Sequence, residues 1–210
     1  VSSRHSGVIH SGIYYESNSL KANLCVEGND LLYNFCEKNN VDYLNCGKLI
    51  VGHGKKDFEE LLRLKDRGVK NGVKGLEILN SNEAKQKEPQ VKCKNALWVP
   101  STGIIDSHGL MQSLEANCRN KGVIIHNNSE VVSLNYKSGK YGLKLRSEDT
   151  IIKSKCLVNS AGLWCDSVAK MLGINGYKIH YCKGDYYGYK GKSEYNCLIY
   201  PLPEKYGLGV

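Results

Sequence analysis

Apolar residues recur at three- and four-residue spacing along much of the chain, which is the period of an amphipathic helix. Leu20, Leu24 and Leu31 predict one such helix over residues 19–38, and the two asparagines that follow favour its end. Further helices are predicted over residues 57–67, residues 81–88 before Pro89, residues 107–120 with Asp106 as N-cap, and residues 164–172.

Short apolar runs and two-residue alternation predict strands between these helices. Single strands are expected over residues 47–53, 76–79 and 96–99. After Gly122 the period changes to two, and strands are expected over residues 123–125, 130–136, 143–146, 151–152 and 156–158, with further strand material over residues 177–210. This order is typical of an α/β layer interleaved with a more antiparallel one.

Composition indicates a globular protein of one large domain or two small ones, with 210 residues, 41% hydrophobic and 24% charged. No apolar run approaches the ~20 residues that cross a bilayer, so we expect no transmembrane segment. The net charge of +8 rests on 24 Lys and 5 Arg, which are scattered. Because no aromatic–basic RNA-binding motif accompanies them, we expect no nucleic-acid partner and a surface that favours a small anionic substrate.

Nine cysteines occur, and the closest two are nine residues apart, so there is no C-x-x-C pair. This spacing argues against a zinc site, an iron–sulfur cluster or thioredoxin chemistry, and we expect no metal. The odd number and the apolar neighbours of residues such as Cys156 predict reduced, buried thiols in a reducing compartment.

Two segments carry candidate chemistry. In the opening segment, residues 2–6 supply donors suited to phosphate or ribityl oxygens, and Gly7 allows close contact with a ligand. In the second segment, residues 157–164, an apolar run ends in small residues just before a helix N-terminus, which favours bound phosphate. Taken alone, the first also fits a solvated polar loop, and the second is better explained as an ordinary tight turn.

Several stretches nevertheless form an ordered set along the chain. They are S-S-R-H-S-G-V-I-H-S-G-I-Y-Y from Ser2, C-G-K-L-I-V from Cys46, T-G-I-I-D from Thr102, L-V-N-S-A-G-L-W-C-D from Leu157 and K-G-D-Y-Y from Lys183. This set resembles the L-2-hydroxyglutarate dehydrogenase/oxidase group of FAD-dependent oxidoreductases, within the D-amino-acid-oxidase-like flavoenzymes. The resemblance covers essentially the whole chain.

The resemblance implies an α/β (α+β) fold, in which an incomplete FAD-binding Rossmann-like domain is interleaved with a mainly antiparallel substrate-binding domain. Residues 1–40 and 106–176 would belong to the FAD-binding domain, and residues 41–105 and 177–210 to the substrate-binding domain. The family's N-terminal G-x-G-x-x-G unit and its C-terminal segment are absent from the sequence. We therefore expect an internal fragment of a longer protein, inactive by itself.

The resemblance also implies roles for individual residues. The residues that would lie along the FAD pyrophosphate, ribityl chain and ring are Ser2, Ser3, Arg4, His5, Ser6 and Gly7. Val131 would contact the adenine through its backbone, and the cofactor would also be lined by Ala161, Gly162 and Trp164. His10 is the predicted catalytic residue, as a base or carboxylate partner, and the candidates for substrate binding are Tyr15, Lys21 and Lys183.

The implied reaction is oxidation of a 2-hydroxy acid, L-2-hydroxyglutarate to 2-oxoglutarate, by hydride transfer to the flavin while a base takes the hydroxyl proton. Holding such a dicarboxylate calls for cationic side chains. Two alternatives stay open: the same fold acting on an amino acid or glycerol phosphate, and an inactive fragment that serves only as a binding module. The resemblance implies that the electron acceptor is either oxygen or a quinone. It places eukaryotic members in mitochondria and bacterial ones in the cytoplasm or peripheral to the inner membrane.

Overall fold

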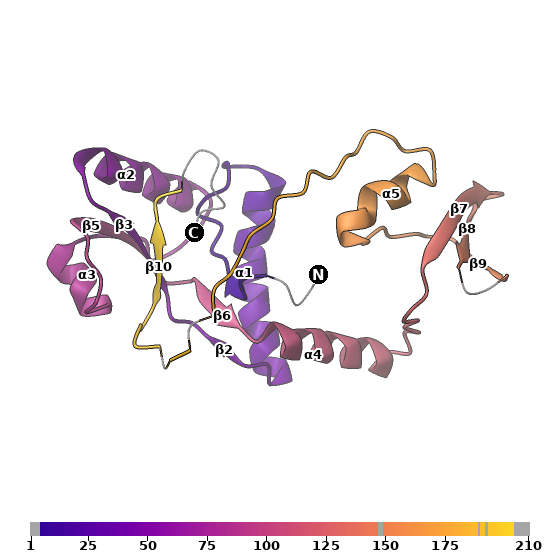
Figure 1. Cartoon of the computed structure of the whole chain (residues 1–210), viewed down its shortest axis with the longest axis horizontal. Helices are drawn as coiled ribbons and strands as arrows, with labels where there is room; N and C mark the ends of the chain where they lie inside the picture. Colours follow the sequence, from indigo (N-terminus) through magenta and orange to yellow (C-terminus); the bar gives the residue numbers. More distant parts are fainter. Residues whose placement is uncertain (1–4, 147–148, 189, 192, 204–210) are drawn as a thin grey trace. The chain divides into compact units, whose positions relative to one another are not determined.

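The computed structural model of the chain describes residues 5–146, 149–188, 190–191 and 193–203, drawn in Figure 1. These residues fall into two compact units: a smaller unit, residues 118–185, and a larger unit, residues 5–117 with the described part of 186–203. In the part of the chain that is described, no helix has the length and apolar character needed to cross a membrane.

The larger unit is built on a four-stranded mixed sheet in the order β10-β3-β5-β4. Its strands are β3 (Lys48–Gly52), β4 (Glu77–Asn80), β5 (Asn95–Val99) and β10 (Leu198–Pro201). β5 runs antiparallel to both β3 and β4, whereas β10 runs parallel to β3. A strand from near the end of the sequence (yellow in Figure 1) thus lies beside one that begins at residue 48.

A second, smaller sheet of the same unit joins three very short strands in the order β1-β6-β2. They are β1 (Val8–Ile9), β2 (Tyr43–Leu44) and β6 (Gly103–Ile105), and both pairings are antiparallel. β1 carries the chain directly into the segment that contains His10. The sheet therefore sets where that segment begins.

Helices α1 (Leu20–Asn39), α2 (Lys55–Lys70), α3 (Ser81–Lys87) and α4 (Ser107–Asn120) have capping residues near their ends. The Ser19 hydroxyl accepts a hydrogen bond from the Ala22 N–H at the start of α1 (3.1 Å), and Asn40 in the left-handed conformation ends it. The Asp106 carboxylate accepts from the His108 N–H at the start of α4 (3.0 Å). These caps satisfy backbone groups that a helix leaves without partners, and the predicted ends of α1 and α4 lie within one residue of the observed ends. Helix α2 instead runs to Lys70, past the end that was predicted before Gly68.

Two apolar clusters lie on opposite faces of the four-stranded sheet, because successive side chains of a strand point to opposite sides. The first cluster joins the sheet to α2, and its buried members are Ile13, Ile50, Leu61, Leu64, Val73, Leu76, Leu97, Val99 and Tyr200. The second includes Leu49 of β3 and Ala84 of α3. Lys48 is two residues before Ile50, so alternation places it on the α2 side.

The smaller unit contains an antiparallel sheet in the order β7-β8-β9. Its strands are β7 (Val131–Lys137), β8 (Lys140–Leu145) and β9 (Ile151–Ser154). Ser138 and Gly139 between the first two both have positive φ, as a two-residue hairpin turn requires. The 3₁₀ turn Gly162–Trp164 follows, then helix α5 (Cys165–Lys170), whose buried Asp166 accepts backbone N–H groups from Ser167 and Ile179.

The predicted α/β class is confirmed, as are the predicted helices that correspond to α1 through α4. Several expectations were wrong. Residues 123–125 and 156–158 form no strand, and Ile124 and Val158 are 80% and 79% exposed. Among described residues no strand pairs with either segment, and a strand persists only where a neighbour takes up its backbone hydrogen bonds.

The expectations for the elements near the end of the chain and for the burial of the thiols were also wrong. The helix predicted over residues 164–172 is shorter, and of the described residues after 177 only β10 forms a strand. All nine cysteines are free thiols, but Cys118, Cys156 and Cys182 are exposed rather than buried. Cys156 is exposed because the buried strand that was to contain it does not form.

Candidate functional site

The opening segment enters the described structure at His5. The predicted cofactor residues that lie outside the described residues are Ser2, Ser3 and Arg4. His5 and Ser6 are exposed, and their side chains accept hydrogen bonds from the backbone N–H groups of Gly7 (3.0 Å) and Val8 (3.4 Å). Gly7 has φ +66°, and its carbonyl accepts from the Ile105 N–H (2.9 Å). The segment thus turns on a glycine and joins β6 directly.

His10 follows β1, and helix α1 holds its backbone. The buried Asn29 amide donates to the His10 carbonyl (3.0 Å) and to the Ser101 carbonyl (2.8 Å). The Cys25 thiol also donates to the His10 carbonyl, at 3.7 Å. Because one side chain bridges two segments far apart in sequence, α1 and the loop before β6 together set the position of His10.

Helix α2 holds the residues just after His10. The Asn71 amide donates to the carbonyls of Gly12 (3.0 Å) and Tyr15 (2.9 Å). The Arg67 guanidinium donates to the Tyr14 carbonyl (3.3 Å). These contacts leave the loop that carries His10 and Tyr14 anchored at both ends.

Lys48 is a member of this site that sequence analysis missed. Its side chain is 0% exposed, and its ammonium donates to the Tyr14 hydroxyl (3.2 Å). The ammonium also lies 4.4 Å and 4.6 Å from the ring centroids of Tyr14 and Tyr200, within cation–π distance. No ion pair between Lys48 and a carboxylate occurs among the residues that the structure describes. The sequence signal that could have identified Lys48 is a lysine at a core-facing position of an otherwise apolar strand.

Burial governs the titration of this cluster, which we call the His10–Lys48 cluster (His10, Tyr14, Lys48 and Tyr200). Loss of solvent lowers the pKa of Lys48 to about 8, an effect that the nearby Cys25 thiolate would oppose. The His10 side chain is exposed on one side, yet partial desolvation and then the Lys48 charge lower its pKa. Desolvation raises the pKa of Tyr14. Both effects on His10 favour its neutral imidazole, while Lys48 keeps its charge below about pH 8.

The predicted substrate-binding residues are only partly brought together. The Lys21 ammonium, in the first turn of α1, lies 4.7 Å from the centroid of the Tyr15 ring. Desolvation raises the pKa of Tyr15, and the Cys25 charge adds to this. Lys183 belongs to the smaller unit, where its exposed ammonium pairs with Asp185 at 2.7 Å. Its role in substrate binding stays a prediction.

In the smaller unit, a cavity of about 550 Å³ brings together three of the predicted cofactor residues. They are Val131, Ala161 and Trp164, and the remaining lining residues are Glu130, Ser167, Val168 and Met171. Gly162 beside them has φ +57°, and a Cβ there would meet no atom within 4 Å. A largely apolar slot with an indole and a few polar groups suits a planar heterocycle, so the residues present fit the adenine end of FAD.

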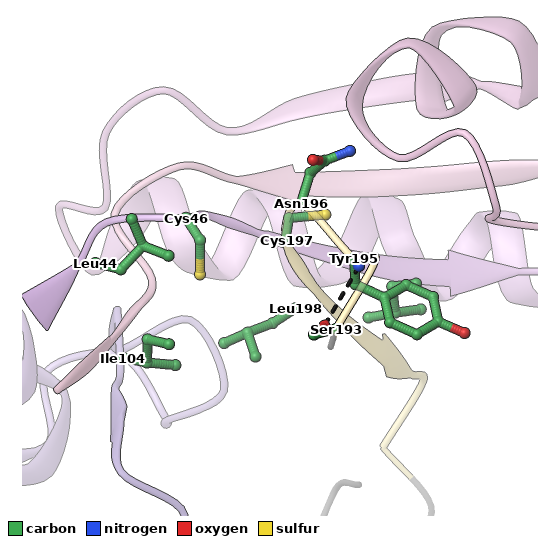
Figure 2. A pocket seen from close by; sticks show the side chains of 9 residues that line it. Leu44, Cys46, Ile104, Ser193, Tyr195, Asn196, Cys197 and Leu198 are labelled. Carbon is green, nitrogen blue, oxygen red and sulfur yellow. Dashed lines mark hydrogen bonds between the residues drawn. The ribbon is translucent and has the colours of Figure 1, made fainter. Parts of the chain in front are cut away.

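A second cavity, of about 530 Å³, lies beside β10 in the larger unit (Figure 2) and was not expected from the sequence. Its lining includes two thiols, Cys46 and Cys197, and among the described residues that line it there is no Lys, Arg or His. Burial raises the pKa of both thiols, that of Cys197 to about 11, so neither is a ready nucleophile at neutral pH. The described lining therefore offers no cationic partner to a dicarboxylate.

Comparison with known protein families and sequences adds to this geometry. The family model for FAD dependent oxidoreductases (DAO) matches residues 1–208. The mitochondrial L-2-hydroxyglutarate dehydrogenase of Arabidopsis thaliana is 36% identical over 100% of this chain and 50% of that protein. L-2-hydroxyglutarate dehydrogenase of Escherichia coli K12 is 33% identical over 95% of this chain and 48% of that protein. The chain therefore spans about half the length of the curated relatives it matches.

Comparison with solved structures identifies the same fold. L-α-glycerophosphate oxidase from Mycoplasma pneumoniae, with FAD bound, superposes with a TM-score of 0.76 at 27% identity, over 82% of this chain and 47% of that one. Glycine oxidase from Geobacillus kaustophilus superposes with a TM-score of 0.70 at 17% identity, over 82% and 48%. The second likeness concerns the fold alone.

Proposed function

The chain belongs to the DAO family of FAD-dependent oxidoreductases, and from this we propose that the full-length protein oxidises L-2-hydroxyglutarate to 2-oxoglutarate. When bound, FAD supplies the acceptor for the hydride that leaves the substrate carbon. The residues of this chain would take the hydroxyl proton, favour a substrate with two carboxylates and hold the cofactor.

The observation that carries the proposal is the position of His10, whose backbone carbonyl accepts a hydrogen bond from the buried Asn29 amide (3.0 Å), while partial desolvation and the Lys48 charge lower the pKa of its imidazole. A neutral imidazole accepts a proton, and Asn29 keeps its backbone in place while it does so. His10 would therefore take the proton from the substrate hydroxyl. The charges of Lys48 and Lys21 give this part of the molecule a positive potential, which favours a substrate with two carboxylates.

Cofactor contacts follow from the two segments described above. The backbone of Val131, with Ala161, Gly162 and Trp164, would hold the adenine end of FAD. The opening segment, residues 2–7, would lie along the pyrophosphate, ribityl chain and ring. We assign residues 1–40 and 106–176 to the FAD-binding part of the protein, and residues 41–105 and 177–210 to the substrate-binding part.

The names of the relatives suggest the setting of the reaction. The relatives from Arabidopsis thaliana and Bos taurus are mitochondrial proteins by name. We therefore assign a mitochondrial location if the source is eukaryotic, and a cytoplasmic or peripheral inner-membrane location if it is bacterial. The electron acceptor is oxygen or a quinone, and oxygen consumption during turnover distinguishes the two.

The test uses the purified full-length protein. We expect a yellow protein with flavin absorbance near ~450 nm that bleaches anaerobically with L-2-hydroxyglutarate, as a reduced flavin does. His10→Asn should keep the colour but bleach at least 100-fold more slowly, the usual contribution of a general base. His53→Asn, an exposed histidine of the same unit, is the matched control and should bleach normally.

A second candidate substrate follows from the FAD-bound glycerophosphate oxidase, which is 27% identical to this chain. Glycerol 3-phosphate is therefore tested beside L-2-hydroxyglutarate under the same conditions. Bleaching by glycerol 3-phosphate alone would reject the hydroxy-acid substrate but keep the flavoenzyme assignment. A full-length protein that holds no flavin would reject both.

A further inference from the structure

One face of the β7-β8-β9 sheet carries lysines from all three of its strands. Lys137 at the end of β7 lies directly opposite Lys140 at the start of β8. Lys153 of β9 lies opposite Gly142, two positions along β8 from Lys140, and therefore points to the same side of the sheet. These lysines are scattered in the sequence, and only the strand register brings them to one face.

The three lysines line a groove of about 450 Å³ on this face. In the strand register Gly142 lies between Asn135 and Lys153, and because it has no side chain it leaves a hollow between them. A Cβ at Gly142 would come within 2.7 Å of the Asn135 Oδ1 atom, so a larger residue would disturb the groove. The described lining residues include no Asp or Glu, and those besides the lysines and Gly142 are Asn135, Ser138, Tyr141 and Ile151.

The charges of this groove are not balanced by the rest of the described structure. The ion pairs that form among the described residues involve none of the three lysines. Like charges directly opposite each other on neighbouring strands, as at Lys137 and Lys140, destabilise a sheet. All three lysines are exposed, so water weakens their repulsion without removing it. The fold gives no reason to gather them, whereas a bound anion would offset the repulsion.

We propose that this lysine groove (Asn135, Lys137, Ser138, Lys140 and Lys153) binds a phosphate group, carried by a small molecule or by a lipid headgroup. Each ammonium is a compact charge with three donors, which suits the tetrahedral oxygens of phosphate. A planar carboxylate is matched better by the fork of an arginine, and the described lining contains no Arg. The Asn135 amide and the Ser138 hydroxyl add neutral donors.

The lysine groove is separate from the cavity that would hold the adenine end of FAD. Val131 of that cavity begins β7 and Lys137 ends it, roughly 20 Å apart at the usual rise of a strand. Phosphate binding in the groove therefore does not depend on which substrate reduces the flavin.

The test compares the full-length flavoprotein with its double variant Lys140→Gln/Lys153→Gln. Calorimetry at constant ionic strength measures binding of inorganic phosphate. Co-sedimentation measures binding to vesicles of phosphatidylglycerol in phosphatidylcholine, against phosphatidylcholine alone. We expect the double variant to bind the phosphate probe about fivefold more weakly, because each exposed charge pair contributes modestly. The matched control is Lys121→Gln/Lys178→Gln, which removes two exposed lysines of the same unit outside the groove and should bind as the wild type does.

Stability gives a second readout, which a purely structural role of these lysines would not produce. Without phosphate, Lys140→Gln removes the repulsion from Lys137 and should raise the urea midpoint slightly. With phosphate, the wild type should gain more stability than the variant, because a ligand that binds only the folded state stabilises it. Equal gains in both proteins would count against the groove.

The two probes distinguish the sources of the phosphate group. Weaker binding of inorganic phosphate by the double variant assigns a soluble phosphate compound, and weaker binding of the anionic vesicles alone assigns a lipid headgroup. An equal loss in the control variant, or no binding of either probe by the wild type, would overturn the proposal. Flavin content and reduction by L-2-hydroxyglutarate should be the same in all three proteins, so failure of the proposed function would leave this test intact.

Discussion

Replacing Lys48 with methionine should make the protein more stable near neutral pH, although it removes a hydrogen bond and two cation–π contacts. The pKa of Lys48 is lowered from 10.5 to about 8 in the folded protein. Since one pKa unit corresponds to about 1.4 kcal/mol, the charge costs the folded state about 3 kcal/mol. Methionine keeps the apolar packing of the lysine stem, but losing the hydrogen bond to Tyr14 destabilises the variant by about 1 kcal/mol, and losing the two cation–π contacts destabilises it by about 1 kcal/mol more. The expected net gain at pH 7 is about 1 kcal/mol.

The pH dependence gives this prediction a second, independent signature. Unfolded Lys48 binds its proton up to about pH 10.5, whereas the folded protein releases it near pH 8. Between these values the unfolded state binds more protons, so the stability contributed by Lys48 rises with pH. Below pH 8 both states are protonated and the full cost is present. The advantage of Lys48→Met should therefore be constant below pH 7.5 and vanish by about pH 10.5.

Urea unfolding followed by tryptophan fluorescence, at pH 7 and pH 10.5, measures the difference between the full-length wild type and Lys48→Met. Buried tyrosines and thiols with raised pKa also titrate in this range, but they do so in both proteins and cancel in the difference. Lys87→Met, which alters an exposed lysine, should change stability by less than about 0.5 kcal/mol at either pH. If Lys48→Met is instead less stable by more than about 1 kcal/mol at pH 7, the lysine charge has a stabilising partner and the reasoning fails.

Three further variants test the site and its surroundings. Asn29→Ala leaves the His10 carbonyl without its 3.0 Å bond, so we expect a loss of about 2 kcal/mol in urea unfolding and a lower kcat with little change in KM; unchanged kcat would show that Asn29 does not position His10. Trp164→Ala removes the indole from the cavity of the smaller unit and should weaken FAD binding about tenfold by fluorescence titration, with Tyr177→Ala as an exposed aromatic control; equal FAD affinity in both would place the adenine elsewhere. Arg146→Met breaks an exposed pair with Glu130 and should lower the urea midpoint only slightly, a difference that disappears in 1 M salt; a large, salt-independent drop in the midpoint would mean the pair is more than a surface contact.

Local patterns determined the helices of this protein. The ends of α1 and α4 were predictable because the groups that cap them, Ser19 and Asp106, lie within three residues of the N–H groups they satisfy. The periodicity of α2 likewise follows from the geometry of a helix turn. By resemblance, the ordered motifs also predicted His10 and the residues around Ala161 as site residues. Each of these inferences needs only neighbouring residues or a known order of segments.

Tertiary structure decided which of the apolar runs became strands, and it decided the character of the site. Residues 123–125 and 156–158 have the apolar composition of strands, but no described strand pairs with them. The sequence G-K-L-I-V offers a lysine in an apolar strand, but it does not show whether that lysine is buried. It is buried because β10, about 150 residues later, aligns with β3 and brings Tyr200 over it, while the loop after His10 brings Tyr14 from the other side. Burial and strand pairing depend on partners distant in sequence, and the charge that acts on His10 is therefore a property of the fold.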